Sequence, residues 1–316
     1  MPPQLVTLHS LDPQRLAAEA AQGLLRPQAA LPPKFFYDAL GSRLFDAITL
    51  LPEYDLTRNE AALFATHRSA IAAAVGAAGA TLVDVGAGSG AKAAAWFAAL
   101  GTRRYLALDI SCDFLAGALD ALAGAHPQVA MCGVGLDFTA ALALPPELLS
   151  GPALVFYPGS SIGNFAPAEA LALLVQMRQL AGPGGALLIG VDLLKPVAEM
   201  EAAYDDALGL TAAFNRNLLA HLNRLLGSDF APRQWRHRAV WNAATQAVEM
   251  HLHAREALTV RWPGAERRFA AGEGIHTENA HKWRVEAFAA LLRRAGFEAV
   301  QTWTDAGERF AVMVGR

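Results

Sequence analysis

The sequence predicts an α/β fold, with a doubly wound, mostly parallel sheet and a second α+β region beside it. Between residues 80 and 191, short apolar runs alternate with helical stretches of roughly 10–15 residues, which is the pattern of βαβ units. A glycine-rich turn, GAGSG at 86–90, follows the first of these runs. The chain has 316 residues, more than the roughly 100–200 of a typical domain, so we expect two domains.

Composition narrows the class of protein. Hydrophobic residues make up 53% of the chain and charged residues 17%, so the chain can bury a large core and is not disordered. Its 26 basic residues are scattered among 29 acidic ones, which argues against a nucleic-acid partner. Two cysteines, Cys112 and Cys132, cannot form a disulfide framework, and we expect a reducing cytoplasm. We see no secretory signal and no apolar stretch of about 20 residues, so we expect no membrane partner.

The N-terminal part predicts two helices. Apolar residues recur on one helical face between Leu44 and Leu51, and Pro52 ends that helix. An alanine-rich run from Thr57 to about residue 78 predicts a longer helix. Glu60 lies three residues after Thr57, and the pair fits a capping box.

The remaining elements follow in order along the chain. We expect strands at 81–85, 104–110, 129–136, 153–157 and 186–191, and helices at 91–100, 112–125 and 167–180. Beyond these, 199–226 reads as one long helix, 238–261 as antiparallel strands, 284–295 as a helix, and 299–305 with 310–314 as a closing hairpin. We assign 58–195 plus 284–316 to the core. The second region, 1–57 plus 196–283, is expected to cover the carboxyl ends of the core strands.

The strongest chemical signal is the turn after the first core strand, with Asp84 two residues before Gly86. Its glycines let the backbone turn tightly and approach a ligand at a helix N-terminus. The spacing G-x-G-x-G has one residue fewer than the dinucleotide motif G-x-G-x-x-G. This spacing, with the acidic residue before it, is typical of S-adenosylmethionine sites.

Residues at the ends of the next two strands support the same ligand. Asp109 ends the second strand, where a carboxylate accepts hydrogen bonds from ribose hydroxyls. Asp137 and Phe138 follow the third strand, where an adenine would lie. The sequence therefore predicts an S-adenosylmethionine site across three strand ends.

Beyond that site, the chain resembles a known family, the histidine Nα-methyltransferases of ergothioneine biosynthesis, which trimethylate L-histidine to hercynine. The resemblance runs from Leu31 to the C-terminus. It rests on the glycine-rich loop and on the blocks PKFFYDALGSRLFDAITLLPEY (33–54), YPGSSIGNF (157–165), AYDDALGLTAAFNRN (203–217) and GEGIHTENAHKW (272–283). It implies a Rossmann-like class I methyltransferase core with a second α+β substrate-binding domain. It also implies an enzyme, expected to be a monomer, that uses S-adenosylmethionine and no metal and methylates the α-amino group of L-histidine.

The resemblance also implies the site residues. The cofactor contacts are Gly86, Gly88, Lys92, Asp109, Asp137 and Phe138, with Lys92 pairing with the cofactor carboxylate. The substrate contacts are Tyr54, Gly159, Asn164, Tyr204, Met250, Glu278 and Ala280, and the catalytic residues are Tyr37 and Tyr204. Asn164 and Tyr204 would hold the substrate carboxylate, while Tyr37 and the Gly159 backbone would orient the amine. Glu278 would hydrogen-bond the imidazole, with Met250 packed against it.

The implied reaction sets three physical demands. The attacking nitrogen must be a neutral amine, and it must lie in line with the sulfonium methyl group. Repeated methylation creates a quaternary cation, which phenol rings attract by roughly 0.5–2 kcal/mol each. No His–carboxylate pair is placed as a strong base, so we expect positioning and desolvation to dominate, with a tyrosine hydroxyl or water relaying the proton.

Two positions depart from the family pattern. The family usually carries a serine two residues after the glutamate, as a second imidazole contact, where this chain has Ala280. Losing one neutral hydrogen bond costs about 0.5–1.5 kcal/mol, which weakens histidine selectivity. His281 either compensates or faces solvent. Asp55 stands where the family often has a second tyrosine.

Three alternatives remain open at this point. In the first, the acceptor is another amino acid, such as tryptophan or a modified histidine, which Ala280 would favour. In the second, the protein is an NAD-dependent oxidoreductase, against which the G-x-G-x-G spacing argues. In the third, it is a binding protein that keeps the fold without catalysis.

Overall fold

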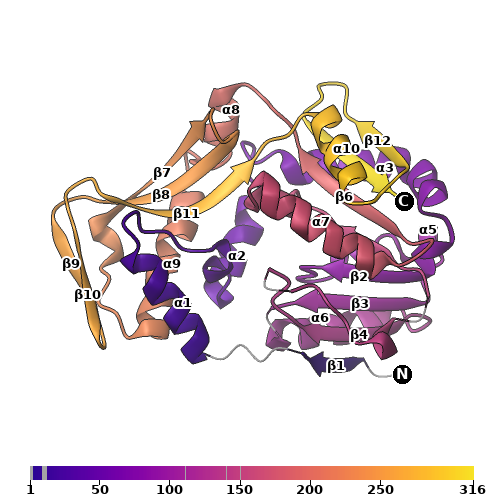
Figure 1. Cartoon of the computed structure of the whole chain (residues 1–316), viewed down its shortest axis with the longest axis horizontal. Helices are drawn as coiled ribbons and strands as arrows, with labels where there is room; N and C mark the ends of the chain where they lie inside the picture. The colour runs from indigo at the N-terminus through magenta and orange to yellow at the C-terminus, as the bar shows by residue number, and fades with distance from the viewer. Residues whose placement is uncertain (1–2, 9–12, 111, 140, 150) are drawn as a thin grey trace.

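The fold was examined in a computed structural model, which describes residues 3–8, 13–110, 112–139, 141–149 and 151–316. Figure 1 shows two regions side by side, one around a large sheet and the other around smaller antiparallel sheets. The chain passes between them after the last parallel strand and returns to the large sheet at its C-terminus.

The larger region is built on an eight-stranded sheet. Its order is β1 (Gln4–Thr7), β4 (Ala130–Gly135), β3 (Arg104–Asp109), β2 (Thr81–Val85), β5 (Leu154–Tyr157), β6 (Ala186–Asp192), β13 (Phe310–Gly315) and β12 (Val300–Thr304). The first six strands run parallel, whereas β13 is antiparallel to both β6 and β12. The order reverses between β2 and β5, so the loop after β2 lies at the switch point where ligands bind in such sheets.

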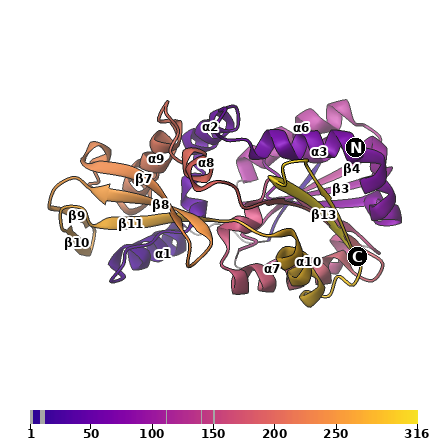
Figure 2. The ribbon, with the colours of Figure 1, turned by 90° about the horizontal axis from the view of Figure 1, so that it is seen from above.

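Helices cover both faces of this sheet, and Figure 2 shows α3 and α6 on one face and α7 and α10 on the other. The helices of the region are α3 (Leu56–Val75), α4 (Ala91–Ala94), α5 (Phe97–Leu100), α6 (Cys112–Ala125), α7 (Pro167–Ala181) and α10 (Val285–Arg294). Alternate strand residues belong to two separate apolar cores, one including α3 and the other α7 and α10. The predicted Rossmann-like, doubly wound core is therefore confirmed.

The second region combines helices with antiparallel strands. Strands β11 (Gly274–His281), β8 (Ala247–Ala254) and β7 (Trp235–Asn242) form one sheet, and β9 (Leu258–Trp262) pairs with β10 (Ala265–Phe269). Its helices are α1 (Pro13–Leu25), α2 (Ala39–Ile48), α8 (Val197–Ala202) and α9 (Leu210–Leu226). Short 3₁₀ turns at Pro33–Phe36, Gly76–Ala80, Pro146–Leu148, Ser161–Asn164 and Pro232–Gln234 complete the described elements. Helix α9 packs against α1, α2 and β7, so it forms the centre of this region.

Three expectations about elements need correction. β1 pairs with β4 at the edge of the core sheet, so residues 4–7 do not lie in the substrate-binding region. The run 91–100 forms two short helices, separated by Ala95 and Trp96, and 199–226 is interrupted after residue 202. At the interruption Asp206 accepts hydrogen bonds from Leu210 N and Thr211 N, so it caps the second helix, α9.

The predicted capping box at Thr57 and Glu60 is wrong. Helix α3 begins at Leu56, and its N-cap residue, Asp55, makes no side-chain cap. Glu60 points into the interior, where only 1% of it is exposed. The groups that bind the Glu60 carboxylate come from other parts of the chain and are described with the active site.

One helix is longer and more apolar than the sequence suggested. Leu56–Ala80, which is α3 with the following 3₁₀ turn, has 25 residues and passes a length and composition test for a membrane-spanning helix. It packs against β6, β12 and β13, and Ile71 and Val75 are fully buried there. A third of its 18-residue apolar window is buried, and the buried side faces the sheet, as in an amphipathic helix.

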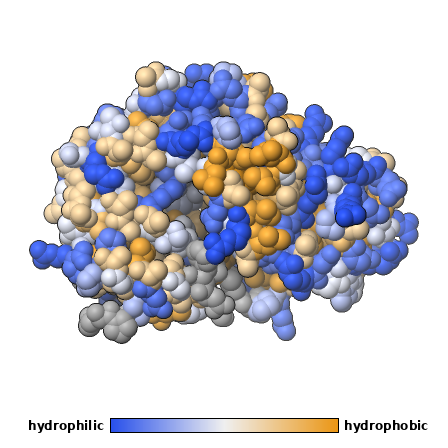
Figure 3. Space-filling view, turned by 180° about the vertical axis from the view of Figure 1, so that it is seen from behind, coloured by the Kyte–Doolittle hydropathy of each residue, from blue (hydrophilic) through white to orange (hydrophobic). Residues whose placement is uncertain are grey.

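Seen from behind, the surface mixes hydrophilic and apolar residues, with one apolar patch near its middle (Figure 3). Among the large apolar side chains that stay exposed are Leu40 at the start of α2 and Leu50 just after it. Phe45 and Ile48, on the same helix, instead line a pocket.

Candidate active site

The glycine-rich loop is shaped by three positive φ angles, 73° at Gly86, 53° at Gly88 and 67° at Gly90. The N–H groups of Gly86 and Ala87 both donate to Leu108 O, at 2.8 and 2.9 Å, which fixes the loop against β3. A Cβ on Gly90 would lie 2.6 Å from Leu122 Cδ1 and 2.8 Å from Tyr105 Oη, and with the positive φ any other residue would be strained there. A Cβ on Gly88 would meet nothing within 4 Å, so the backbone is open to a ligand at that point.

Two aspartates support this loop. Gly88 N donates to Asp109 Oδ2 at 2.9 Å, which ties the loop to the end of β3. Asp84 is buried and accepts a hydrogen bond from Tyr105 Oη at 2.8 Å. Burial raises the pKa of Asp84 to about 7, although the Tyr105 hydrogen bond acts in the opposite direction. Asp84 therefore acts on the loop through Tyr105, which lies beside Gly90, whereas Asp109 binds the loop directly at Gly88.

The end of β4 places Asp137 and Phe138 beside the loop. The Phe138 ring is the nearest group to a Cβ built on Gly86, at 3.6 Å. Asp137 Oδ2 pairs with Lys34 Nζ at 2.9 Å, and Asp137 Oδ1 accepts from Thr139 N at 3.0 Å. Although burial opposes it, hydrogen bonds from Thr139 and Lys34 lower the pKa of Asp137, so it is ionised. The predicted cofactor residues thus lie together at the carboxyl ends of the three neighbouring strands β2, β3 and β4.

Lys92 connects the predicted cofactor residues to the predicted substrate residues. Its Nζ pairs with Glu60 Oε2 at 2.7 Å, and Glu60 Oε1 accepts from Gly159 N at 2.6 Å. A Cβ on Gly159 would lie 3.3 Å from Lys92 Nζ. The pairing of Lys92 with the cofactor carboxylate stays a prediction, because its partner here is Glu60. Since the Gly159 N–H is engaged, its carbonyl is the backbone group suited to an amine.

A small pocket of about 50 Å³, partly open to solvent, lies next to Gly159. Eight predicted residues line it together: Tyr37, Tyr54, Gly159, Asn164, Tyr204, Met250, Glu278 and Ala280. They come from the N-terminal segment, the loop after β5, the connection between α8 and α9, and strands β8 and β11. The predicted cofactor residues do not line this pocket. Glu60, which binds both Gly159 N and Lys92 Nζ, joins the two sets.

Aromatic rings form one wall of the pocket. The Tyr54 and Tyr204 rings meet edge to face at 6.1 Å between centroids, and Tyr37 meets Phe45 and Phe214 at 5.8 and 5.9 Å. Burial raises the pKa values of Tyr54 and Tyr204 well above the usual value, so both phenols are neutral at physiological pH. A neutral, electron-rich wall of this kind suits a cation.

The opposite wall carries Glu278, which is only 9% exposed. It pairs with Met250 across β11 and β8, directly after a bulge between His276 and Glu278. In the amide orientation that satisfies both its ends, Asn164 Nδ2 donates to Glu278 Oε1 at 3.2 Å. Burial raises the pKa of Glu278 to about 8, and the charge of Lys282 opposes that shift. Glu278 can therefore exchange a proton with a ligand near neutral pH.

His281 is buried, so the expectation that it might face solvent is wrong. It lines the pocket, and its Nδ1 lies 3.0 Å from Thr245 O, which indicates an N–H donated to that carbonyl. Burial lowers the pKa of His281, so the ring is neutral.

Sequence reasoning missed Lys282, whose side chain is 1% exposed and also lines the pocket. Lys282 Nζ lies 2.7 Å from Asp192 Oδ2 and donates to Tyr204 Oη at 3.0 Å. Because that oxygen accepts from an ammonium group, the Tyr204 proton must point to another acceptor. The Lys282 contact therefore makes Tyr204 a donor toward a ligand in the pocket.

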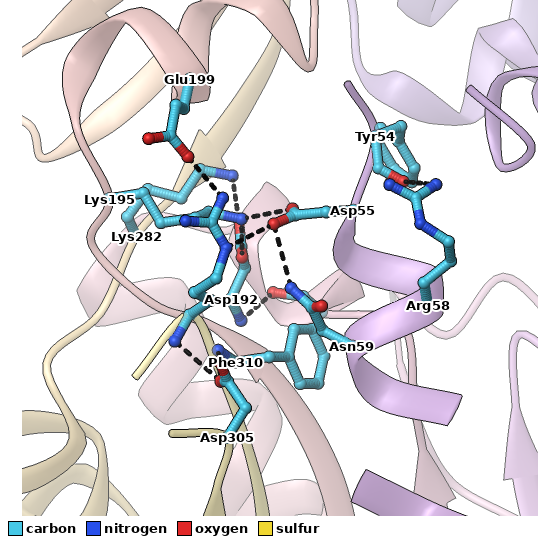
Figure 4. Close-up of polar contacts among 12 residues, drawn as sticks. Tyr54, Asp55, Arg58, Asn59, Asp192, Lys195, Glu199, Lys282, Asp305 and Phe310 are labelled. Carbon is cyan, nitrogen blue, oxygen red and sulfur yellow. Dashed lines mark hydrogen bonds and ion pairs between the residues drawn. The ribbon is translucent and has the colours of Figure 1, made fainter. Parts of the chain in front are cut away.

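Asp192 continues this contact into a network of buried charges, shown in Figure 4. Its Oδ1 lies 2.8 Å from Lys195 Nζ, which also donates to Asp55 Oδ1 at 2.7 Å. Asp55 Oδ2 in turn accepts from Arg309 Nε at 2.8 Å. Asp55, which departs from the family pattern, thus ties the N-terminal segment to β6 and β13. Lys282 stands in the last sequence block, 272–283, which was the available signal for it. Its partners could not be inferred because they are distant in the chain.

The chain is similar in sequence to proteins of one known family. A family model described as histidine-specific methyltransferase, SAM-dependent, matches residues 16–316. The chain is 39% identical over 305 residues to a histidine N-alpha-methyltransferase of Mycolicibacterium smegmatis, covering 95% of this chain and 94% of that one. Against a histidine N-alpha-methyltransferase of Mycobacterium tuberculosis it is 37% identical over 303 residues, covering 94% and 93%. It is also 28% identical over 317 residues to ergothioneine biosynthesis protein 1 of Neurospora crassa, covering 94% of this chain and 35% of that protein.

Proposed function

The chain belongs to the family of S-adenosylmethionine-dependent, histidine-specific methyltransferases, and on that premise we propose that it trimethylates the α-amino group of L-histidine to hercynine, a step of ergothioneine biosynthesis. The observation that carries the proposal is the pocket. It gathers Glu278 and Asn164 with the rings of Tyr37, Tyr54 and Tyr204, and Glu60 links its Gly159 to Lys92, just after the glycine-rich loop. These polar and aromatic groups complement an amino acid with an imidazole side chain.

Each end of histidine has a complementary partner in the pocket. Tyr204 donates to the α-carboxylate, because Lys282 occupies its oxygen. Asn164 would also contact the carboxylate, which requires its amide to turn from Glu278. Glu278 hydrogen-bonds the imidazole beside Met250. The Gly159 carbonyl accepts from the amine, since the Gly159 N–H is bound to Glu60.

The reacting nitrogen must lose a proton before each transfer. Tyr37 and Tyr204 are the proposed catalytic residues, because both line the pocket. The Tyr204 phenol is too weak an acid to act as a phenolate at neutral pH, so a hydroxyl passes a proton only by donating and accepting together. The rings of Tyr37 and Tyr54 stabilise the growing ammonium group by cation–π attraction, roughly 0.5–2 kcal/mol each. Positioning supplies the remaining rate enhancement.

The residues at the carboxyl ends of β2, β3 and β4 fit S-adenosylmethionine. Gly86 and Gly88 leave the backbone accessible, and the Asp109 carboxylate lies at the loop rim, where it can accept from ribose hydroxyls. Asp137 and Phe138 would contact the adenine. When bound, S-adenosylmethionine supplies the methyl group from its sulfonium. The chain orients the acceptor amine toward it and excludes water.

Mass spectrometry of products from a panel of amino acids incubated with the protein and S-adenosylmethionine tests the proposal. We expect histidine to gain three methyl groups and tryptophan to remain unmodified. A higher kcat/KM for tryptophan or a modified histidine would support the alternative acceptor, which the relatives' names do not favour. The family assignment gives no support to the oxidoreductase or the non-catalytic alternative.

The setting and organisation of the enzyme are also proposed. We infer a cytoplasmic monomer without nucleic-acid or membrane partners, in line with free thiols at Cys112 and Cys132 and a net charge of −3. We further propose that 58–195 plus 284–316 bind the cofactor. In the same scheme 1–57 plus 196–283 bind the amino acid, except for β1.

A further inference from the structure

A cluster of metal-ligand side chains lies on the β7–β8–β11 sheet. Glu249 and His251 lie two residues apart on the same face of β8, and His276 on β11 is the direct cross-strand partner of His251. One carboxylate oxygen and two imidazole nitrogens, one from each residue, all lie within 4.8 Å of one another. His251 Nε2 and Glu249 Oε2 are 3.2 Å apart.

These distances suit a small divalent ion. Ligand atoms about 2.0–2.1 Å from a tetrahedral ion lie roughly 3.4 Å from each other. The Glu249–His251 pair already has that spacing. All three residues are half-buried, so modest side-chain rotation can bring the third ligand atom into place while solvent retains access. The strand pairing fixes their backbones, because β8 is bonded on both sides, to β7 and β11.

Neighbouring side chains orient two of the ligands. Asn242 Nδ2 donates to Glu249 Oε1 at 2.8 Å, which leaves Glu249 Oε2 facing His251. On β11, His276 Nε2 lies 3.0 Å from Asn279 Oδ1. Second-shell hydrogen bonds of this type hold metal ligands in place.

We propose that Glu249, His251 and His276 bind one divalent transition-metal ion of the zinc class, with water completing its coordination. Two imidazoles favour zinc-like ions over Mg²⁺ or Ca²⁺, which prefer oxygen ligands. The ion takes no part in methyl transfer, because Met250 and Glu278 point to the pocket from the opposite face of the same strands.

The ion acts as a clamp across the two strands that carry the imidazole end of the pocket. His276 precedes the bulge on β11, and Glu278 follows it. Joining His276 to β8 restrains the bulge from the side opposite the pocket. The sequence predicted no metal because His276 lies 25 residues after His251, without the short spacing of a motif.

Calorimetric titration of the full chain, without a polyhistidine tag, with ZnCl₂ tests the site. We expect one ion per chain, no comparable binding of MgCl₂, and at least tenfold weaker zinc binding in His276→Ala and Glu249→Gln. His253→Ala is the matched control, because His253 lies on the same face of β8 but its Nδ1 binds Gly272 O. This control should bind zinc within twofold of the unchanged protein.

Thermal unfolding gives a second readout. Zinc should raise the Tm of the unchanged protein and of His253→Ala, and leave the Tm of His276→Ala unchanged. Circular dichroism confirms that each variant is folded before titration. Equal zinc affinity in His276→Ala and the unchanged protein, or no binding by the unchanged protein, overturns the proposal. Neither result depends on methyltransferase activity.

Discussion

Replacing Lys282 with methionine tests how the buried ion network serves the substrate pocket. The side chains of Lys282 and Asp192 are both 1% exposed, and their charged atoms lie 2.7 Å apart. Removing one partner of a buried pair costs about 3–5 kcal/mol, because the other charge is left without compensation. Asp192 keeps Lys195 at 2.8 Å, so we expect the lower end of that range.

The same substitution removes the donor to Tyr204 Oη. Tyr204 is then free to donate to Asp192 or another acceptor, and its hydrogen bond to the substrate carboxylate is weakened. A hydrogen bond to a charged group contributes about 1.5–3 kcal/mol, which corresponds to a loss of roughly 10- to 150-fold in kcat/KM for histidine. The loss should appear in KM through the carboxylate contact and in kcat through the proton step, since Tyr204 is proposed for both.

Urea unfolding and steady-state kinetics measure the two effects separately. The double variant Asp192→Asn, Lys282→Met removes both charges and should recover part of the lost stability while keeping the raised KM. Tyr204→Phe should raise KM to a similar degree, and adding Lys282→Met to it should have little further effect on KM. An unchanged KM in folded Lys282→Met protein would refute the link between Lys282 and Tyr204.

Three further variants test other parts of the site. Ala280→Ser should lower the KM for histidine by roughly 2- to 13-fold, because it restores one hydrogen bond of about 0.5–1.5 kcal/mol; an unchanged KM for histidine would contradict this. Burial raises the Glu278 pKa from 4.5 to about 8. Between these pH values the folded state binds more protons than the unfolded state, so the free energy of unfolding falls as pH rises toward 8. Glu278→Gln should therefore lose less stability than the unchanged protein when urea unfolding is compared at pH 6 and pH 8; equal losses would argue against the shift. Gly90→Ala should weaken S-adenosylmethionine binding and stability more than Gly88→Ala, since its Cβ meets Tyr105 Oη, and calorimetry that ranks them the other way would disprove the loop geometry.

Much of the core could be predicted because its signals are local. Strand and helix periodicities from β2 to β6 depend on neighbouring residues, and the glycine positions follow from a backbone that must turn within a few residues. The family blocks likewise carried seven of the eight predicted pocket residues, all but Met250, and the fold brings the eight to one cavity. The errors fell where a local rule was overridden by burial, as at Glu60, which leaves its helix cap to bind Lys92 and Gly159.

By itself, the sequence determined the order of the elements, the glycine-rich loop and the chemical types of the residues around the pocket. The tertiary structure alone decided which charges are paired. Lys282 reaches Tyr204 across 78 positions, and Glu60 reaches Gly159 across 99. Such partners share no sequence period, because sheet topology and helix packing bring them together. Only the folded chain therefore shows that Tyr204 is held as a donor and that three residues on β8 and β11 form a candidate metal site.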